Sequence, residues 1–101
     1  MIHITDKHKD MVYEITSKYA PDCEVRAFGS RVKGTHRSYS DLDLLFVGER
    51  ELGWSRVGDL REAFMESDIP FRVDVLDYHL TSPEFLAAIE NTCEVLFPVQ
   101  A

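Results

Sequence analysis

The chain has 101 residues, of which 45% are hydrophobic and 29% charged, as expected for one soluble globular domain. Its formal net charge of −7 argues against a general nucleic-acid-binding protein, which must neutralise phosphates with an excess of basic side chains. No apolar run is long enough for a bilayer and the polar N-terminus does not resemble a signal peptide, so we expect a cytoplasmic protein with no membrane association.

The first part of the chain predicts a helix, a strand and a short helical turn. Residues 5–19 carry apolar side chains at helical spacing, and Thr5 is a suitable N-cap. Residues 23–28 alternate between two faces, as expected for a strand: Cys23, Val25 and Ala27 would lie on one face, and Glu24, Arg26 and Phe28 on the other. Gly29 then interrupts the strand, and residues 30–34 are long enough for one turn of helix.

The rest of the chain predicts two further helices and three further strands. In order, they are a strand at 42–47, a helix at 55–67, a strand at 71–76, a helix at 81–91 and a short strand at 94–98. Ser82 and Pro83 are a suitable N-cap and first residue for the last helix. This order predicts an α/β (α+β) fold, with a small sheet of about four strands and helices packed on it. The pattern leaves the order and direction of the strands open.

Two aspartates stand together at the start of the predicted strand 42–47. Side chains two residues apart in a strand share a face, so Asp41 and Asp43 project together and repel each other. A divalent cation between them would remove the repulsion, and oxygen ligands select Mg²⁺ or Mn²⁺. Asp74, a lone acid in strand 71–76, is the candidate third ligand, and three carboxylates can hold two ions. The alternative is a set of solvated surface acids.

A glycine-serine pair and a basic loop precede the two aspartates. Gly29 allows a sharp turn and the close approach of a ligand, while Ser30 adds a hydroxyl donor at the start of a helical turn, which favours anions. Arg31 and Lys33 add positive charge, and residues 25–40 contain no acid. The segment is therefore a candidate phosphate-binding loop, although an ordinary turn followed by a solvated basic loop would have the same sequence.

Taken together, these motifs resemble the minimal nucleotidyltransferases of the DNA polymerase beta superfamily. The superfamily pattern is Gly-Ser, a spacer, D-x-D and a third carboxylate on a later strand. Here these parts are FGSRVKG, ten residues between Ser30 and Asp41, SDLDLLFV, and FRVDVLD. The resemblance covers almost the whole chain. It implies a nucleotidyltransferase fold with a mixed sheet, in a single minimal nucleotidyltransferase domain over residues 1–101.

The resemblance also implies the roles of individual residues. The implied nucleotide-binding residues are Gly29, Ser30, Arg31 and Lys33, and the implied catalytic residues and Mg²⁺ ligands are Asp41, Asp43 and Asp74. Asp74 would be able to deprotonate the incoming hydroxyl as well as to ligate metal. Two Mg²⁺ ions, or Mn²⁺ in their place, would be the metal cofactors, and ATP would be the nucleotide donor.

Members of this group are often paired with a small helical HEPN-type protein, which is a substrate-binding protein or a toxin. In several such pairs the nucleotidyltransferase is the antitoxin and transfers AMP from ATP to a tyrosine of the toxin. The resemblance therefore implies such a transfer to a HEPN-type partner within a hetero-oligomer. Two alternatives stay open: a non-catalytic antitoxin that occludes its partner, and nucleotidyl transfer to a small-molecule hydroxyl.

Three residues near these motifs have no assigned role in the sequence. Arg72 shares a face with Asp74, so it either pairs with a carboxylate or contacts the nucleotide. Tyr39 and Trp54 are able to stack on a base, but core or partner-facing positions would account for them equally.

Overall fold

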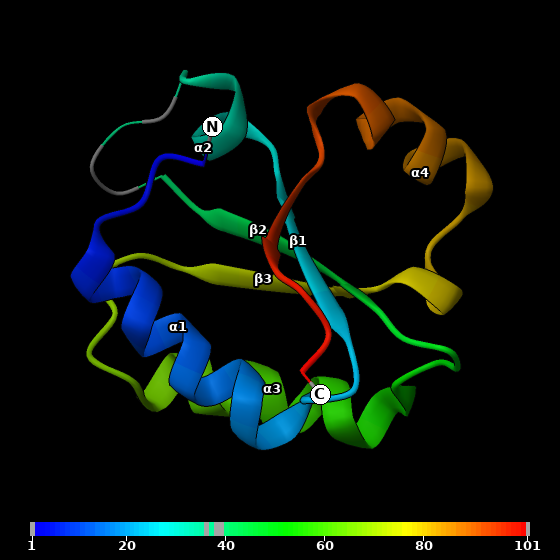
Figure 1. Cartoon of the computed structure of the whole chain (residues 1–101), viewed down its shortest axis with the longest axis horizontal. Coiled ribbons are helices and arrows are strands. Elements are labelled where there is room, and N and C mark those ends of the chain that lie inside the picture. Colours follow the sequence, from blue (N-terminus) through cyan, green and yellow to red (C-terminus); the bar gives the residue numbers. More distant parts are fainter. Residues whose placement is uncertain (1, 36, 38–39, 101) are drawn as a thin grey trace.

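The computed structural model describes residues 2–35, 37 and 40–100, which form four α-helices, four strands and two 3₁₀ turns (Figure 1). The helices are α1 (Asp6–Tyr19), α2 (Ser30–Lys33), α3 (Gly53–Glu66) and α4 (Pro83–Ile89). The strands are β1 (Glu24–Phe28), β2 (Leu42–Val47), β3 (Val73–Asp77) and β4 (Glu94–Phe97). The 3₁₀ turns at Tyr78–Leu80 and Glu90–Thr92 flank α4. The predicted α/β (α+β) class and the predicted order of helices and strands are confirmed.

The four strands form one mixed sheet in the order β3-β2-β1-β4. β2 is parallel to β3 and antiparallel to β1, and β1 is antiparallel to β4. β2 is therefore an inner strand with a neighbour on each side, whereas β3 lies at one edge of the sheet. The register places Asp43 of β2 between Asp74 of β3 and Phe28 of β1.

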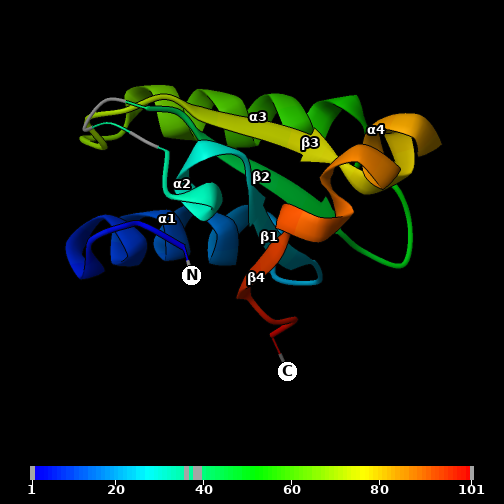
Figure 2. The same ribbon diagram turned by 90° about the horizontal axis from the view of Figure 1, so that it is seen from above.

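One face of the sheet carries the main hydrophobic core. Helices α1 and α3 lie next to each other on this face, and α3 follows β3 along its length (Figures 1 and 2). The most deeply buried side chains of this core are Val12, Val25, Leu42, Leu44, Phe46, Leu60 and Val75. Their burial is the main contribution to the stability of the fold, at roughly 1.5–3 kcal/mol for each large apolar side chain.

Among the residues that the structure describes, those that cover the opposite face of the sheet lie at one end of it. There α4 packs over Leu45 of β2, and Phe85 of α4 meets Phe28 of β1 edge to face, with 5.8 Å between ring centroids. Leu45 is consequently buried, so β2 is covered on both faces at this position. Asp43 and Asp74 lie on this face too, and both are only half-buried.

The two longest helices begin with different kinds of cap. The Thr5 hydroxyl accepts a hydrogen bond from the backbone N–H of His8 at 3.2 Å, which is the predicted N-cap of α1. The start of α3 depends on a residue far along the chain. The Asp77 carboxylate, at the end of β3, accepts hydrogen bonds from the N–H groups of Leu52 (2.6 Å) and Gly53 (3.4 Å). The helix therefore begins before the predicted residue 55.

Replacing Asp77 is expected to destabilise the protein. Its buried carboxylate also accepts the N–H of His79 at 3.0 Å, so Asp77→Ala would leave three backbone donors without this acceptor. We expect a loss of about 2–4 kcal/mol in the free energy of unfolding, measured by urea denaturation. Asp77→Asn keeps one acceptor oxygen and should lose less. Equal stability of Asp77→Ala and the wild type would contradict this role.

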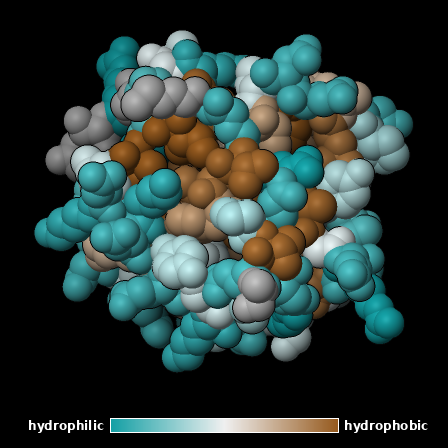
Figure 3. Space-filling model, viewed as in Figure 1, coloured by the Kyte–Doolittle hydropathy of each residue, from teal (hydrophilic) through white to brown (hydrophobic). Residues whose placement is uncertain are grey.

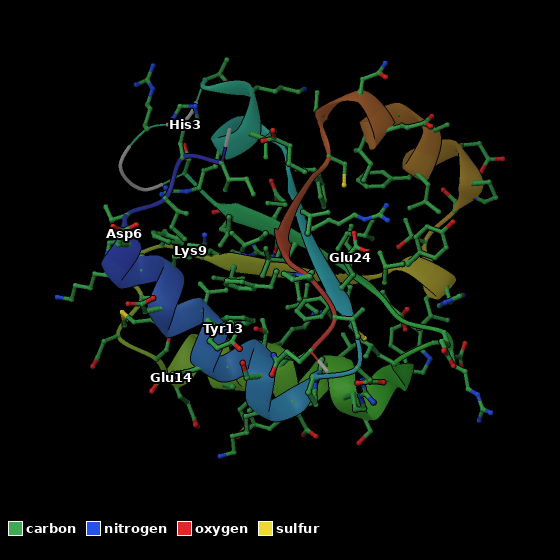
Figure 4. All side chains as sticks on the ribbon, in the orientation of Figure 1. His3, Asp6, Lys9, Tyr13, Glu14 and Glu24 are labelled. Atoms are coloured by element: carbon green, nitrogen blue, oxygen red, sulfur yellow. The ribbon has the colours of Figure 1, made fainter. Side chains whose placement is uncertain are left out.

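The surface of the face seen in Figure 1 has an apolar area between α2 and β4 (Figure 3). Ile2, Ile4 and Val32, from the N-terminal segment and α2, are partly buried against the core. On α1, Tyr13 lies beside β4 (Figure 4), and its ring meets that of Phe97 edge to face at 5.0 Å. This area is at the β4 side of the sheet, away from Asp74 on β3.

Both cysteines, Cys23 and Cys93, are free thiols. Cys23 is buried, and this burial raises the pKa of its thiol to about 11. Among the residues that the structure describes, no helix is both long and apolar enough to cross a bilayer.

Candidate active site

Two carboxylates from distant parts of the chain lie side by side on the half-covered face of the sheet. In the parallel pairing of β2 and β3, Asp43 is directly opposite Asp74, so both side chains project from the same face. They are close enough to share a hydrogen bond when one of them is protonated. Period-two alternation in each strand explains this arrangement, because the neighbouring residues Leu42 and Val73 point into the core.

Asp41 lies one residue before β2 and is partly buried. The negative charge of Asp41 raises the pKa of Asp43, as does that of Asp74. Within residues 2–35, 37 and 40–100, however, no three histidine, cysteine, aspartate or glutamate side chains are grouped closely enough to hold a metal ion. The structure thus brings together Asp43 and Asp74, and the binding of a metal ion by Asp41, Asp43 and Asp74 stays a prediction.

The carboxylate pair carries negative charge that the protein only partly compensates. Burial, followed by the charge and hydrogen bond of Asp74, raises the pKa of Asp43 to about 6. Arg72 acts in the opposite direction, and its Nη2 lies 3.0 Å from Asp74 Oδ1. This ion pair confirms one of the two roles predicted for Arg72, although its side chain is 74% exposed and the pair is weak. A pair of carboxylates whose repulsion is only partly relieved fits a hard divalent cation such as Mg²⁺.

The glycine of the Gly-Ser turn touches the carboxylate pair. Gly29 follows β1, precedes α2 and has a φ of 82°, a conformation that disfavours other residues. A Cβ atom at this position would overlap with the Oδ2 atom of Asp43. The turn therefore lies directly against the carboxylates, and only a residue without a side chain leaves the Asp43 carboxylate where it is.

The rest of the turn forms the single helical turn α2. The carbonyl of Ser30 accepts hydrogen bonds from the N–H groups of Gly34 (3.0 Å) and Thr35 (3.1 Å), and Gly34 ends the turn in the left-handed conformation. Lys33 is exposed at the end of this turn. Contacts of Ser30 and Lys33 with a nucleotide stay predictions.

Arg31 is held by the protein's own backbone. It is only 6% exposed, its Nε donates to the carbonyl of Ser40 at 3.0 Å, and its Nη1 donates to the carbonyl of His3 at 3.0 Å. Its guanidinium also lies over the ring of Phe71, 4.1 Å from the centroid. Figure 4 shows His3 next to α2. Arg31 thus joins the Gly-Ser turn to the residue before Asp41 and to the approach to β3, and a direct contact with a nucleotide stays a prediction.

Arg31→Ala is expected to lower the free energy of unfolding by about 2–4 kcal/mol, because it removes the hydrogen bonds to two carbonyls and leaves a void beside Phe71. The matched control is Arg37→Ala, an exposed arginine of the same loop, for which we expect a change within about 0.5 kcal/mol. Urea denaturation measures both. Similar losses in the two variants would show that the contacts of Arg31 are not specific.

The structure assigns no base-stacking role to the two aromatic residues considered for it, Tyr39 and Trp54. Tyr39 lies outside the described residues. Trp54, at the start of α3, is 77% exposed, and base stacking by its ring stays a prediction. A residue that the sequence did not single out is Arg61 of α3, whose Nη2 donates to the carbonyl of Val75 at 3.2 Å, on the outer edge of β3.

Comparison with known proteins gives relatives over nearly the whole chain. Residues 5–100 match the family described as "Polymerase beta, Nucleotidyltransferase". A protein of Haemophilus influenzae named "Probable protein adenylyltransferase MntA" is 42% identical over 95 residues, which cover 94% of this chain and 83% of that protein.

Solved structures share the fold at lower identity. A crystal structure of a toxin–antitoxin with AMP-PNP aligns with a TM-score of 0.75 and 19% identity, over 91% of this chain and 74% of that one. The complex of a tri-AMPylated Shewanella oneidensis HEPN toxin with an MNT antitoxin aligns with a TM-score of 0.71 and 17% identity, over 94% and 73% of the two chains. These likenesses concern the fold, and they confirm the predicted nucleotidyltransferase architecture.

Proposed function

Because this chain belongs to the polymerase beta nucleotidyltransferase family, and is therefore a nucleotidyltransferase, we propose that it transfers AMP from ATP to a tyrosine hydroxyl of a HEPN-type partner and thereby acts as an antitoxin. The observation that carries the proposal is the pairing of Asp43 with Asp74 directly against Gly29. The name of the Haemophilus relative supports a protein acceptor. The AMPylated toxin of the Shewanella complex supports AMP as the transferred group and a hetero-oligomer as the assembly.

On the donor side, the proposed binding residues are Gly29, Ser30 and Lys33. Gly29 has no side chain, so phosphate oxygens can approach the backbone next to the carboxylates. The exposed ammonium group of Lys33 would add positive charge for a triphosphate. Arg31 would hold the turn in place, and its direct contact with the nucleotide stays a prediction.

The proposed reaction is a displacement at the α-phosphorus of ATP. The tyrosine oxygen forms a bond to this phosphorus, the bond from the phosphorus to the bridging oxygen of the β-phosphate breaks, and pyrophosphate leaves. Asp74 accepts the proton of the tyrosine hydroxyl. Asp41, Asp43 and Asp74 are the proposed ligands of Mg²⁺ or Mn²⁺, with two ions as the expected number, and a bound cation would neutralise the phosphate charge. All these residues would belong to one catalytic domain, residues 1–101.

The test is a transfer assay with the HEPN-type partner, Mg²⁺ and ATP labelled at the α-phosphate. We expect covalent label on the partner, a mass increase of one AMP and a modified tyrosine in its peptide map. ATP labelled at the γ-phosphate should leave the partner unlabelled. Inhibition of the partner without label would instead support an occluding antitoxin, and label on an added small molecule alone would support the other alternative.

A further inference from the structure

A groove of about 520 Å³ lies between α3 and the edge strand β3, and Asp74 is among its lining residues. Five of its eight lining residues are apolar, two are arginines, and one is Asp74. Its floor includes Ile69 and Phe71, each 8% exposed, and its rim includes Met65, which is 85% exposed. Asp74 of the proposed active site is therefore one of the residues that line this mostly apolar depression.

We propose that this groove is the acceptor subsite: it binds the phenol ring of the acceptor tyrosine and directs the hydroxyl toward Asp74. The inference rests on the proposed function and adds the location of the acceptor side chain and the residues that select it.

The order of the strands places the groove on the side of the carboxylates opposite Gly29, from which an acceptor would approach. Gly29 follows β1, Asp43 lies on β2, Asp74 lies on β3, and the groove lies beyond β3. The attacking and leaving oxygens lie roughly in line on opposite sides of a transferred phosphoryl group. Because the donor phosphates are proposed at Gly29, the acceptor has to approach from the β3 side, where the groove opens.

The lining of the groove fits an aromatic ring better than other hydroxyl acceptors. The exposed Met65 at the rim offers a thioether contact, which favours an aromatic side chain. A sugar or a serine would leave this apolar surface without a matching partner, and its own polar groups without hydrogen bonds. The volume is within the range of about 300–1,000 Å³ that is usual for ligand pockets, enough for one ring and its flanking backbone.

The charges at the groove fit a hydroxyl that loses its proton. Arg72 is next to Asp74, with 3.0 Å between Nη2 and Oδ1, and its exposed side chain is free to turn toward an incoming oxygen. A guanidinium at this point would stabilise the negative charge that develops on a phenol oxygen, whose ordinary pKa is about 10. Arg61 donates to the carbonyl of Val75 on the outer edge of β3. This contact occupies the strand edge, so the occupant enters as a side chain and not as an added strand.

The first experiment measures binding without the reaction. N-acetyltyrosinamide is titrated into the full, uniformly ¹⁵N-labelled chain, and we expect shifts of the amides of Met65 and Ile69, with those of Ser55 unchanged. N-acetylserinamide should give no such shifts, and Met65→Glu should weaken the tyrosinamide response at least about fivefold. Shifts confined to other parts of the chain, or the same Met65 and Ile69 shifts with ATP alone, would overturn the proposal.

The second experiment measures transfer to the HEPN-type partner. We expect Met65→Glu to raise KM for the partner about tenfold or more while KM for ATP stays within about twofold, and Met65→Leu to restore the wild-type value. Ser55→Glu adds the same charge to an exposed position of the same helix and serves as the control. If Met65→Glu transfers like the wild type, the groove is not the acceptor subsite and the proposed function stands. If the wild type transfers nothing, the proposed function fails, and the tyrosinamide titration alone decides the groove.

Discussion

Asp43→Asn is expected to lower the rate of AMP transfer by at least about 100- to 1,000-fold and to make the metal-free chain more stable at pH 7. The loss of activity follows from removing one charged oxygen ligand from the pair that Asp43 forms with Asp74. The same change removes the repulsion between the two carboxylates, so the folded protein should benefit. We expect comparable losses of transfer for Asp41→Asn and Asp74→Asn, with little loss of folding.

The gain in stability should depend on pH. The folded protein binds the Asp43 proton more tightly than the unfolded chain, because its pKa is raised from 3.8 to about 6. Ionisation of Asp43 therefore lowers stability progressively as the pH rises through this range, and the cost is complete above about pH 6. After allowance for the half exposure of Asp43, we expect Asp43→Asn to gain about 1 kcal/mol at pH 7 and almost nothing at pH 4.

Urea denaturation with a chelator at the two pH values measures this gain, and the labelled-ATP assay measures transfer. Asp59→Asn, on the exposed side of α3, removes a charge that has no part in the site and is the control for net charge. Transfer by Asp43→Asn at the wild-type rate would rule out the proposed role of Asp43 as a catalytic metal ligand. A gain that is the same at pH 4 and pH 7 would show that the carboxylate pair is not its origin.

Gly29→Ala is expected to reduce transfer by about 100-fold, because the added methyl group displaces the Asp43 carboxylate that it would overlap. The variant should also lose about 1–3 kcal/mol of stability, since a φ of 82° with a ψ of −155° is a conformation essentially confined to glycine. The measurements are transfer to the partner and urea denaturation, with binding of ATP followed separately.

The chain offers a matched control for this substitution. Gly34 has a φ of 80°, at the other end of α2, but a Cβ there would meet nothing closer than 3.5 Å. Gly34→Ala should therefore retain most of the transfer activity. Its loss of stability should be smaller, about 1–2 kcal/mol, because Gly34 lies in the left-handed helical region with ψ at 12°. If both variants lose activity equally, backbone strain in the loop is the cause and the contact between Gly29 and Asp43 is not.

Local patterns in the sequence were sufficient for most of the fold. The apolar periodicity of residues 5–19 and the cap at Thr5 are properties of one segment, so the position of α1 was predicted closely. The start of α3 was predicted two residues too late, because the carboxylate that caps this helix belongs to Asp77 at the end of β3. The order and direction of the strands depend on pairing between segments far apart, which no local pattern specifies.

The candidate site divides in the same way. Alternation within each strand predicted that the side chains of Asp43 and Asp74 would point away from the core. The structure adds that the two residues are directly opposite each other in the pairing of β2 with β3. The sequence of the basic loop suggested that Arg31 was available for a ligand. Its burial depends on His3 and Phe71, which are adjacent to it only after folding. The groove beside Asp74 is likewise formed between α3 and β3, and no single motif indicates it.

The pairing of β2 with β3 makes enzymatic turnover a reporter of correct folding. A displacement of β3 by one residue along β2 would turn one carboxylate toward the apolar interior while leaving a compact chain with a similar content of helix and strand. Circular dichroism would hardly distinguish such a species, whereas recovery of AMP transfer after dilution from denaturant would count only molecules in which these two segments have found their native alignment.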